Sequence, residues 1–141
     1  MTNFDEKDYG PKPYVVNIEA LTLENENFRT TKWTGEHLQM TVMAIPVGGD
    51  IGLEQHQHND QFIRIEQGRG KVEMGQAEDQ LEFVQEVEAD EAVFVPAGAW
   101  HNITNIGDEP MKLYTIYGPK DHLPGTLHRT QEDARNDPNE D

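Results

Sequence analysis

The middle of the chain consists of short runs of β-branched and other apolar residues that end at Gly, Pro or Asp. Seven such runs are expected to be strands, and they cover residues 39–45, 61–66, 71–74, 81–87, 92–95, 101–106 and 111–117. Short strands separated by turn residues every 8–12 positions or so indicate an antiparallel sandwich or barrel. No sustained helical period interrupts this region. The pattern therefore predicts an all-β fold.

The two flanks are more polar and carry only brief helical signals. Asn17 can cap a short helical turn, and Thr130 begins a stretch of capping-box form that soon runs into a proline. We expect an N-terminal arm over residues 1–35 that packs on a barrel over 36–120. We expect residues 121–141 to form a polar C-terminal tail that is mobile from about residue 129.

The distribution of large apolar residues supports this division. Leu, Ile, Val and Phe make up 30 of the 141 residues, a share close to the range of disordered chains with high net charge. However, 21 of the 30 lie between residues 38 and 117. The middle segment can therefore bury a core, and the disorder signal applies to the ends.

Charge and composition exclude several classes of protein. The chain has 11 Lys and Arg against 27 Asp and Glu, so its net charge is −16. Such acidity disfavours nucleic acid and anionic membranes as partners. The absence of cysteine excludes disulfides and thiolate metal sites. No apolar run is long enough to span a bilayer, and the acidic N-terminus does not resemble a signal peptide, so we expect a cytoplasmic protein.

Seven acidic residues between positions 78 and 91 stand without a single Lys or Arg among them. The simplest interpretation is a solvated loop and strand edge, where charge discourages edge-to-edge pairing. The same interpretation, solvent exposure, applies to three of the histidines, namely His37, His122 and His128. Packing of the C-terminal tail over the barrel mouth is the alternative for His122 and His128.

Two short motifs carry the candidate chemistry. The first is His56-Gln57-His58, in which a regular strand would place both imidazoles on one face, close enough to bind one metal ion. Two surface histidines beside a polar turn are the alternative. The second motif runs from Pro96 to Asn105, and in it His101 follows a Pro-Ala-Gly turn and opens a new strand.

Together these motifs resemble the two signature motifs of the cupin superfamily. In the first, His56, His58 and Gly68 match, and Gln61 stands where the family has an acidic residue. In the second, the matching residues are Pro96, Gly98, His101 and Asn105, while Asp90 replaces the leading glycine. The resemblance covers residues 36–120 and is greatest to the small single-domain bacterial cupins, of the RmlC-like type.

The resemblance implies an antiparallel jelly-roll barrel, the double-stranded β-helix, with a metal ion inside it. The ion would be a divalent transition metal (Mn, Fe, Ni or Zn) held by His56, His58 and His101. Gln61 offers only a neutral carbonyl oxygen, a weaker ligand than the usual carboxylate. Gln61 either binds the ion directly or forms a hydrogen bond with one of the residues or molecules that bind it.

Two further residues are candidates for proton transfer. Glu54 shares strand parity with His56, so it can face inward as a ligand or a base; a solvated position near the barrel mouth is its alternative. On strand 111–117 the phase is ambiguous: either Tyr114 and Ile116 point inward, or Leu113 and Tyr117 do. In the first case Tyr114 is a second candidate proton acceptor.

Two classes of function fit these observations. The first is a metal-dependent enzyme (a dioxygenase, isomerase or lyase) acting on a small organic molecule in the barrel. The second is a non-catalytic module that binds or senses a small molecule or metal, which the Gln at position 61 favours. A metal-free cupin using His101 as an acid–base group is a weaker third. Outward-facing Phe62 and Arg64 also predict a homodimer.

Overall fold

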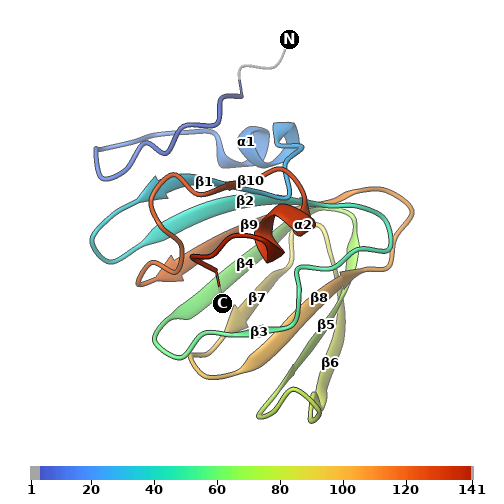
Figure 1. The fold of residues 1–141 in the computed structure, drawn as a ribbon. Coiled ribbons are helices and arrows are strands. Elements are labelled where there is room, and N and C mark those ends of the chain that lie inside the picture. Colours follow the sequence, from blue (N-terminus) through green and yellow to red (C-terminus); the bar gives the residue numbers. More distant parts are fainter. Residues whose placement is uncertain (1–3, 141) are drawn as a thin grey trace.

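The protein consists of two antiparallel sheets packed face to face, as the computed structural model of residues 4–140 shows (Figure 1). The ends of the predicted 1–35 and 121–141 segments, residues 1–3 and residue 141, lie outside the described residues. The larger sheet contains, in spatial order, β10 (Leu127–His128), β1 (Arg29–Thr34), β2 (Gln39–Ile45), β9 (Met111–Gly118), β4 (Asp60–Gln67) and β7 (Ala92–Val95). The smaller sheet contains β3 (Glu54–Gln55), β8 (Trp100–Asn105), β5 (Arg69–Gly75) and β6 (Phe83–Glu88).

All seven predicted strands are present, and the all-β prediction is confirmed. The strands that sequence patterns missed are β1, β3 and β10. β1 has only one large apolar residue, Trp33, yet nearly all its side chains are buried because it pairs with β2 on one side and β10 on the other. The larger sheet therefore extends beyond the predicted 36–120 barrel at both ends of the chain.

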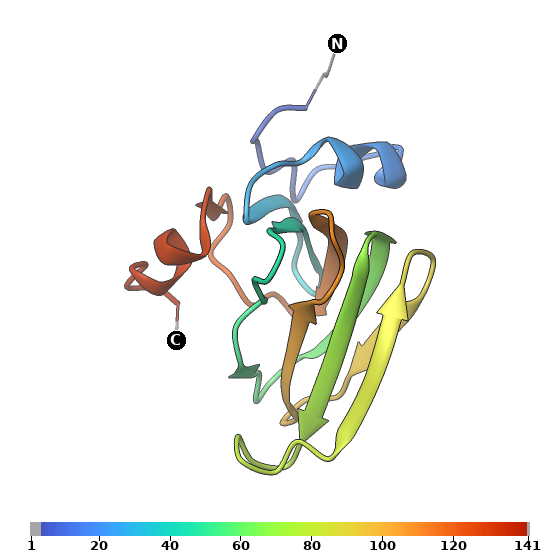
Figure 2. The same ribbon diagram turned by 90° about the vertical axis from the view of Figure 1, so that its right-hand side faces the viewer.

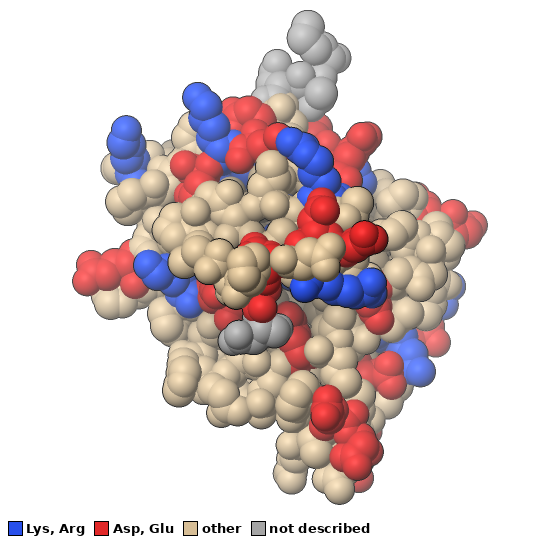
Figure 3. All heavy atoms as spheres, viewed as in Figure 1, with Lys and Arg blue, Asp and Glu red and all other residues tan. Residues whose placement is uncertain are grey.

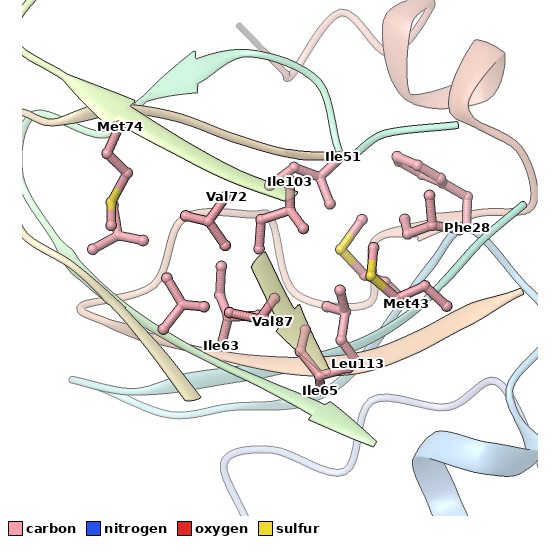
Figure 4. Packing of buried hydrophobic residues seen from close by; sticks show 14 residues of the cluster. Phe28, Met43, Ile51, Ile63, Ile65, Val72, Met74, Val87, Ile103 and Leu113 are labelled. Carbon is pink, nitrogen blue, oxygen red and sulfur yellow. The ribbon is translucent and has the colours of Figure 1, made fainter. Parts of the chain in front are cut away.

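Strand alternation sends one set of side chains into the space between the sheets. Ile63, Ile65 and Leu113 point inward from the larger sheet and meet Val72 and Ile103 from the smaller one (Figure 4). Each of these five side chains is at most 1% exposed. This apolar layer is the core that holds the two sheets together.

The inner face of the larger sheet changes from apolar to polar along its length. Gln39, Tyr117 and Gln61 lie opposite one another on β2, β9 and β4, and Thr41 and Thr115 form the next row. All five are buried, and the hydroxyls of Thr41 and Thr115 are 2.8 Å apart. One end of the barrel interior is thus lined with groups that need polar partners.

The C-terminal arm, residues 119–140, supplies many of these partners. Figure 1 shows it in front of the larger sheet, and Figure 2 shows it at one side of the molecule. The backbone N–H groups of Asp121 and His122 donate to Gln39 Oε1 at 3.0 and 2.9 Å, and Gln39 Nε2 donates to the His122 carbonyl at 2.8 Å. The expectation of exposed histidines here is wrong: His122 and His128 are 3% and 2% exposed.

Two short helices flank the sheets. α1 (Ile18–Glu24) begins at Asn17, whose side chain accepts a hydrogen bond from the Ala20 N–H, as the sequence predicted. α2 (Gln131–Arg135) lies in the C-terminal arm, and Thr130 forms the predicted capping box with Asp133. The arm is therefore a folded segment packed on the barrel, whereas its polar composition had suggested a mobile tail.

The outer face of the larger sheet packs against α1 and the N-terminal arm. Phe62 points outward, as predicted, and its ring contacts Phe94 and Tyr114 at centroid distances of 5.1 and 6.1 Å. Phe94 is 71% exposed. Arg64 also points outward and donates to Asp90 at 3.0 Å. The homodimer through this face stays a prediction.

Charge on the surface follows the sequence pattern. Acidic side chains gather at the tip of the β5–β6 hairpin, which projects at the lower end of the view in Figure 3, and Glu78, Asp79 and Glu82 are exposed there. β6 itself is the edge strand of the smaller sheet, as expected for a charged edge. In the described part of the chain, no helix is long and apolar enough to cross a bilayer.

A matched pair of leucines tests the position of the core. Leu113→Ala is expected to lower the free energy of unfolding by about 2–5 kcal/mol, because it opens a cavity at a fully buried position. Leu123→Ala, at a position 54% exposed, is expected to change it by less than about 0.5 kcal/mol. Urea denaturation measures both, and equal losses would contradict this assignment of the core.

Candidate metal centre

Three side chains with metal-binding atoms meet at the mouth of the barrel, namely Glu54, His56 and His101. One ligand atom from each lies within 4.8 Å of the others. Glu54 Oε1 is 3.1 Å from His56 Nε2 and 3.5 Å from His101 Nε2, and the two imidazole centroids are 5.2 Å apart. The centre therefore combines two imidazoles with one carboxylate.

Local strand pairing explains this arrangement. β3 is only two residues long, and it places Glu54 directly opposite His101 on β8. Alternation then returns His56 to the side of Glu54. The Gly98 N–H donates to the His56 carbonyl at 2.8 Å, which ties His56 to the turn that precedes His101.

His101 directs its Nε2 into the interior. Its Nδ1–H donates to the Ala99 carbonyl at 3.2 Å, which leaves Nε2 as the ring nitrogen available to a ligand. His101 is 1% exposed, and Nε2 has no hydrogen-bond partner among the described residues. A buried ring nitrogen of this kind is suited to a metal ion, because an unsatisfied polar atom is otherwise costly.

His56 is held between two carboxylates. Its Nδ1–H donates to Asp121 Oδ1 at 2.9 Å, and its Nε2–H donates to Glu54 Oε1 at 3.1 Å. Burial alone would lower the pKa of His56, but hydrogen bonds to Asp121 and Glu54 outweigh it and raise the pKa to about 10. The imidazole is therefore positively charged in the metal-free protein near neutral pH.

The pKa values of the two carboxylates, Glu54 and Asp121, are shifted downward. Burial would raise the pKa of Glu54, but the imidazoles of His101 and His56 hold it well below the usual range. The pKa of Asp121 is lowered too, because the charge and hydrogen bond of His56 outweigh burial. Both groups are therefore ionised, which is the state that binds cations.

Gln61 and Tyr117 line the interior next to this centre. Gln61 is 3% exposed, and its Oε1 has no partner within residues 4–140. Tyr117 lies opposite Gln61 in the sheet, and its ring meets the His56 ring edge-on at 5.6 Å. Burial raises the pKa of the Tyr117 hydroxyl, so it is a neutral hydrogen-bonding group.

The residues present fit a divalent transition metal. Imidazole nitrogen and carboxylate oxygen are common ligands of these ions, and two buried polar atoms, His101 Nε2 and Gln61 Oε1, lack hydrogen-bond partners in the part of the chain described. Glu54 supplies the negative charge that the amide of Gln61 cannot. The possibility that Glu54 faces inward is thus the one that the structure supports.

Two residues predicted for the site do not join this group of ligand atoms. His58 lines the same cavity as His56 but is exposed, because β3 ends at Gln55 and the chain bends at residues 57–58, which breaks the alternation assumed for His56 and His58. Tyr114 lies on the outer face of β9, in a cluster with Leu21 and Val42, so it cannot contact Glu54. Tyr117 is the inward-facing tyrosine.

Sequence reasoning missed Asp121, and it gave packing of the tail over the barrel mouth only as the alternative to a surface position. Asp121 lies 65 positions after His56 in the sequence, outside both motifs, in a segment whose polar composition favoured solvent exposure. A better signal was available in β9, where one of the two alternative phases placed Tyr117 inside. Nothing in the sequence indicated which phase the strand would take.

The other motif residues shape the backbone around the centre. Gly98 adopts φ +89°, in the left-handed region that favours glycine, at the turn before His101. Asp90 has φ +73°, which explains why a glycine is usual there in the resembled motif. Asn105 Nδ2 donates to the carbonyls of Ile45 and Glu109 at 3.0 and 2.9 Å. These residues position the strands that carry the ligands.

Comparison with known proteins agrees with this architecture. The sequence profile of the family described as "Cupin domain" matches residues 41–117, more than half of the chain. The chain belongs to the cupin family. The match begins within β2 and ends within β9, so strands β3 to β8 and both motifs are inside it, whereas β1, β10 and Asp121 are outside.

Two relatives extend the similarity of this cupin over the arms. The chain is 56% identical to protein YrkC of Bacillus subtilis over 128 residues, 91% of this chain and 69% of YrkC. It is 39% identical to protein L612 of Acanthamoeba polyphaga mimivirus over 115 residues, 81% of this chain and 70% of L612.

A solved structure also matches closely. The crystal structure of BH2720 from Bacillus halodurans has a TM-score of 0.90 at 54% identity and covers 92% of this cupin and 98% of BH2720. The similarity therefore includes more than the barrel core.

The charge state of His56 generates a pH prediction for the metal-free protein. Its folded pKa, about 10, lies above the ordinary value of 6.5, so its ion pairs stabilise the fold fully below about pH 6.5 and lose this contribution as the pH rises through about 10. Ring ¹⁵N shifts of His56 are expected to show no titration between about pH 6 and 9.

Asp121→Asn tests whether the ion pair with Asp121 raises the pKa of His56. It removes one of the two charges that stabilise the imidazolium, so the His56 midpoint is expected to move to lower pH. A midpoint near neutral pH in the wild type, unaffected by Asp121→Asn, would contradict the ion-pair assignment.

Proposed function

We propose that this cupin is a metal-dependent enzyme that acts on a small organic molecule inside the barrel. The observation that carries the proposal is the meeting of Glu54, His56 and His101 at ligand distances, with the buried Nε2 of His101 left without a partner among residues 4–140. When bound, a divalent ion would supply Lewis acidity toward an oxygen of the ligand.

The chain's own residues would prepare the site for such a ligand. A cavity of about 660 Å³ opens at the centre and is lined by Glu54, His56, Asn59 and Asp121 among others, which is room for a small organic molecule. Gln61 Oε1 could accept a hydrogen bond from the ligand or bind the ion. The buried Tyr117 hydroxyl, 3.2 Å from His122 Nε2, is a neutral group that could orient the ligand.

A non-catalytic binding module is the second candidate. The neutral amide at position 61 favours it, because it lowers the negative charge around the ion. Glu54 weakens this argument, since it contributes an ionised carboxylate at the same centre. The choice of substrate and of reaction type (dioxygenation, isomerisation or elimination) awaits turnover measurements with the metal-loaded protein.

The composition of the centre is testable by metal content. Untagged wild-type protein is expected to hold close to one equivalent of a transition metal, and His101→Ala to lose at least about tenfold in metal affinity, because a buried ligand is removed. Elemental analysis by mass spectrometry measures both. His37→Ala, at an exposed histidine far from the centre in sequence, is the control that should retain the metal.

His58→Ala distinguishes a centre that uses Glu54 with His56 and His101 from one that uses His58 with the same two histidines. Retained metal would agree with the exposed position of His58, whereas loss equal to that of His101→Ala would support the ligand set implied by the family motif. Less than about a tenth of an equivalent of any transition metal in the wild type, unchanged by His56→Ala, would contradict the proposal as a whole.

Position 61 offers a graded test of the same centre. Gln61→Glu is expected to tighten metal retention if the side chain contacts the ion, because a carboxylate is a stronger ligand than an amide. Competition with a chelator measures the retention. An unchanged affinity would place Gln61 outside the ligand set without affecting the assignment of Glu54, His56 and His101.

A further inference from the structure

An arginine is buried beside the proposed metal centre. Arg29 on β1 is 3% exposed and lines a cavity of about 380 Å³ together with Glu54 and Glu140. Its Nη1 donates to His128 Nδ1 at 3.0 Å, while its Nε has no hydrogen-bond partner within the described chain. A guanidinium is costly to bury unless an anion compensates it.

The carboxylate that pairs with Arg29 is that of Glu140 in the C-terminal arm, while Glu54 adds a second negative charge in the same cavity. Glu140 Oε1 lies 3.6 Å from Arg29 Nη1, and Glu140 Oε2 accepts from His122 Nδ1 at 2.7 Å. One carboxylate is thus held between a guanidinium and an imidazole, a combination that would hold the carboxylate of a free ligand equally well. The Arg29 contact is longer than a hydrogen bond, so a ligand could improve on it.

Glu140 stands between Arg29 and the metal centre. It lines both the cavity of about 380 Å³ that contains Arg29 and the cavity of about 660 Å³ that contains His56. Leu53 and Glu54 also line both. A small molecule bound in the place of the Glu140 carboxylate would therefore lie next to the proposed ligands of the metal.

The end of the arm is held mainly by polar contacts. α2 buries none of its residues fully, although Ala134 packs against the core and Gln131 Nε2 donates to Asp50 at 2.8 Å. Glu140 follows α2 by way of a turn in which the Glu140 N–H donates to the Asp137 carbonyl at 3.1 Å. Displacing the Glu140 side chain would remove its contacts with Arg29 and His122 and so weaken the packing of the end of the arm.

A second metal site is not the better explanation for this cluster. His128, Asp137 and Glu140 do bring ligand atoms within 4.8 Å of one another. However, Arg29 Nη1 donates to His128 Nδ1 and His128 Nε2–H donates to Asp137, so both ring nitrogens are occupied. The guanidinium charge would also repel a cation. The site suits an anion.

We propose that Arg29 and His122 form a carboxylate-binding subsite, that the Glu140 side chain fills it in the free protein, and that the carboxylate of a small organic acid takes its place. The position of the subsite beside a reactive centre rests on the proposed function; the exchange itself does not. Replacing one carboxylate with another leaves the charge around Arg29 unchanged, so Arg29 is compensated in both states.

The test uses the metal-free full chain, so that it does not depend on the metal centre. Succinate is the probe, and calorimetry measures its affinity. Glu140→Gln is expected to bind succinate at least about tenfold more tightly than the wild type, because the competing side-chain carboxylate is gone and the competent state is more populated. Glu132→Gln makes the same change of charge at an exposed position of α2 and should leave the affinity unchanged.

Two more measurements complete the test. Arg29→Gln in the Glu140→Gln background is expected to abolish succinate binding, and succinamide should not bind to Glu140→Gln. Because Arg29 is buried and its replacement can disturb folding, hydrogen exchange of residues 129–140 in the wild type provides a second readout. Saturating succinate is expected to speed this exchange.

Equal succinate affinities of the wild type and Glu140→Gln would overturn the proposal, and so would unchanged exchange of the arm. Binding of inorganic phosphate in preference to succinate would overturn the assignment of a carboxylate. A protein that holds metal but fails these tests would retain the proposed function and lose only this subsite. A protein that passes these tests but binds no metal would retain the carboxylate subsite and lose the proposed function.

Discussion

Buried polar groups at one end of the barrel need partners, and this requirement shapes much of the molecule. Gln39, Thr41, Thr115 and Tyr117 all point into the interior from the larger sheet. Two threonines satisfy each other, whereas Gln39 and Tyr117 are satisfied by His122 and its neighbours in the C-terminal arm. A barrel without the arm would expose or orphan these groups, at a cost of roughly 1–3 kcal/mol for each buried group.

The same requirement separates structural polar groups from the functional centre. Gln39 makes hydrogen bonds with both its amide oxygen and its amide nitrogen, so it can only support the fold. Gln61 lies in the same row of the inner face, on the other side of Tyr117, and its Oε1 has no partner in the described chain. The Nε2 of His101 likewise has none. The contrast points to the side of the barrel where a ligand or metal would complete the hydrogen bonding.

The arm also sets the electrostatics of the centre. Asp121 adds a second carboxylate to His56, so the imidazole is charged in the absence of metal. A metal ion at His56 would have to displace the Nε2 proton that His56 donates to Glu54. Glu140 brings a carboxylate to Arg29 in the neighbouring cavity. Binding at the centre and packing of the arm are therefore physically linked, and residues 121–140 belong to the site as well as to the fold.

The strands were largely predictable because the turn residues between them are unambiguous. β2 and β7 begin and end where their apolar runs do, and the Pro-Ala-Gly turn before His101 is where the motif puts it. β1 was not predictable, since its burial comes from neighbouring strands and not from its own composition. His58 was misplaced because strand alternation holds only while the chain is a strand, and β3 ends at Gln55.

The sequence by itself determined the all-β class, the cupin motifs and the pairing of His56 with His101, because these follow from local patterns and short spacings. Tertiary structure alone decided that Glu54 completes the centre, that Tyr117 and not Tyr114 faces inward, and that Asp121 and Glu140 reach the interior. The physical reason is that these outcomes depend on strand register and on packing between segments far apart in the chain. The hydrophobic pattern within a single segment cannot predict such contacts.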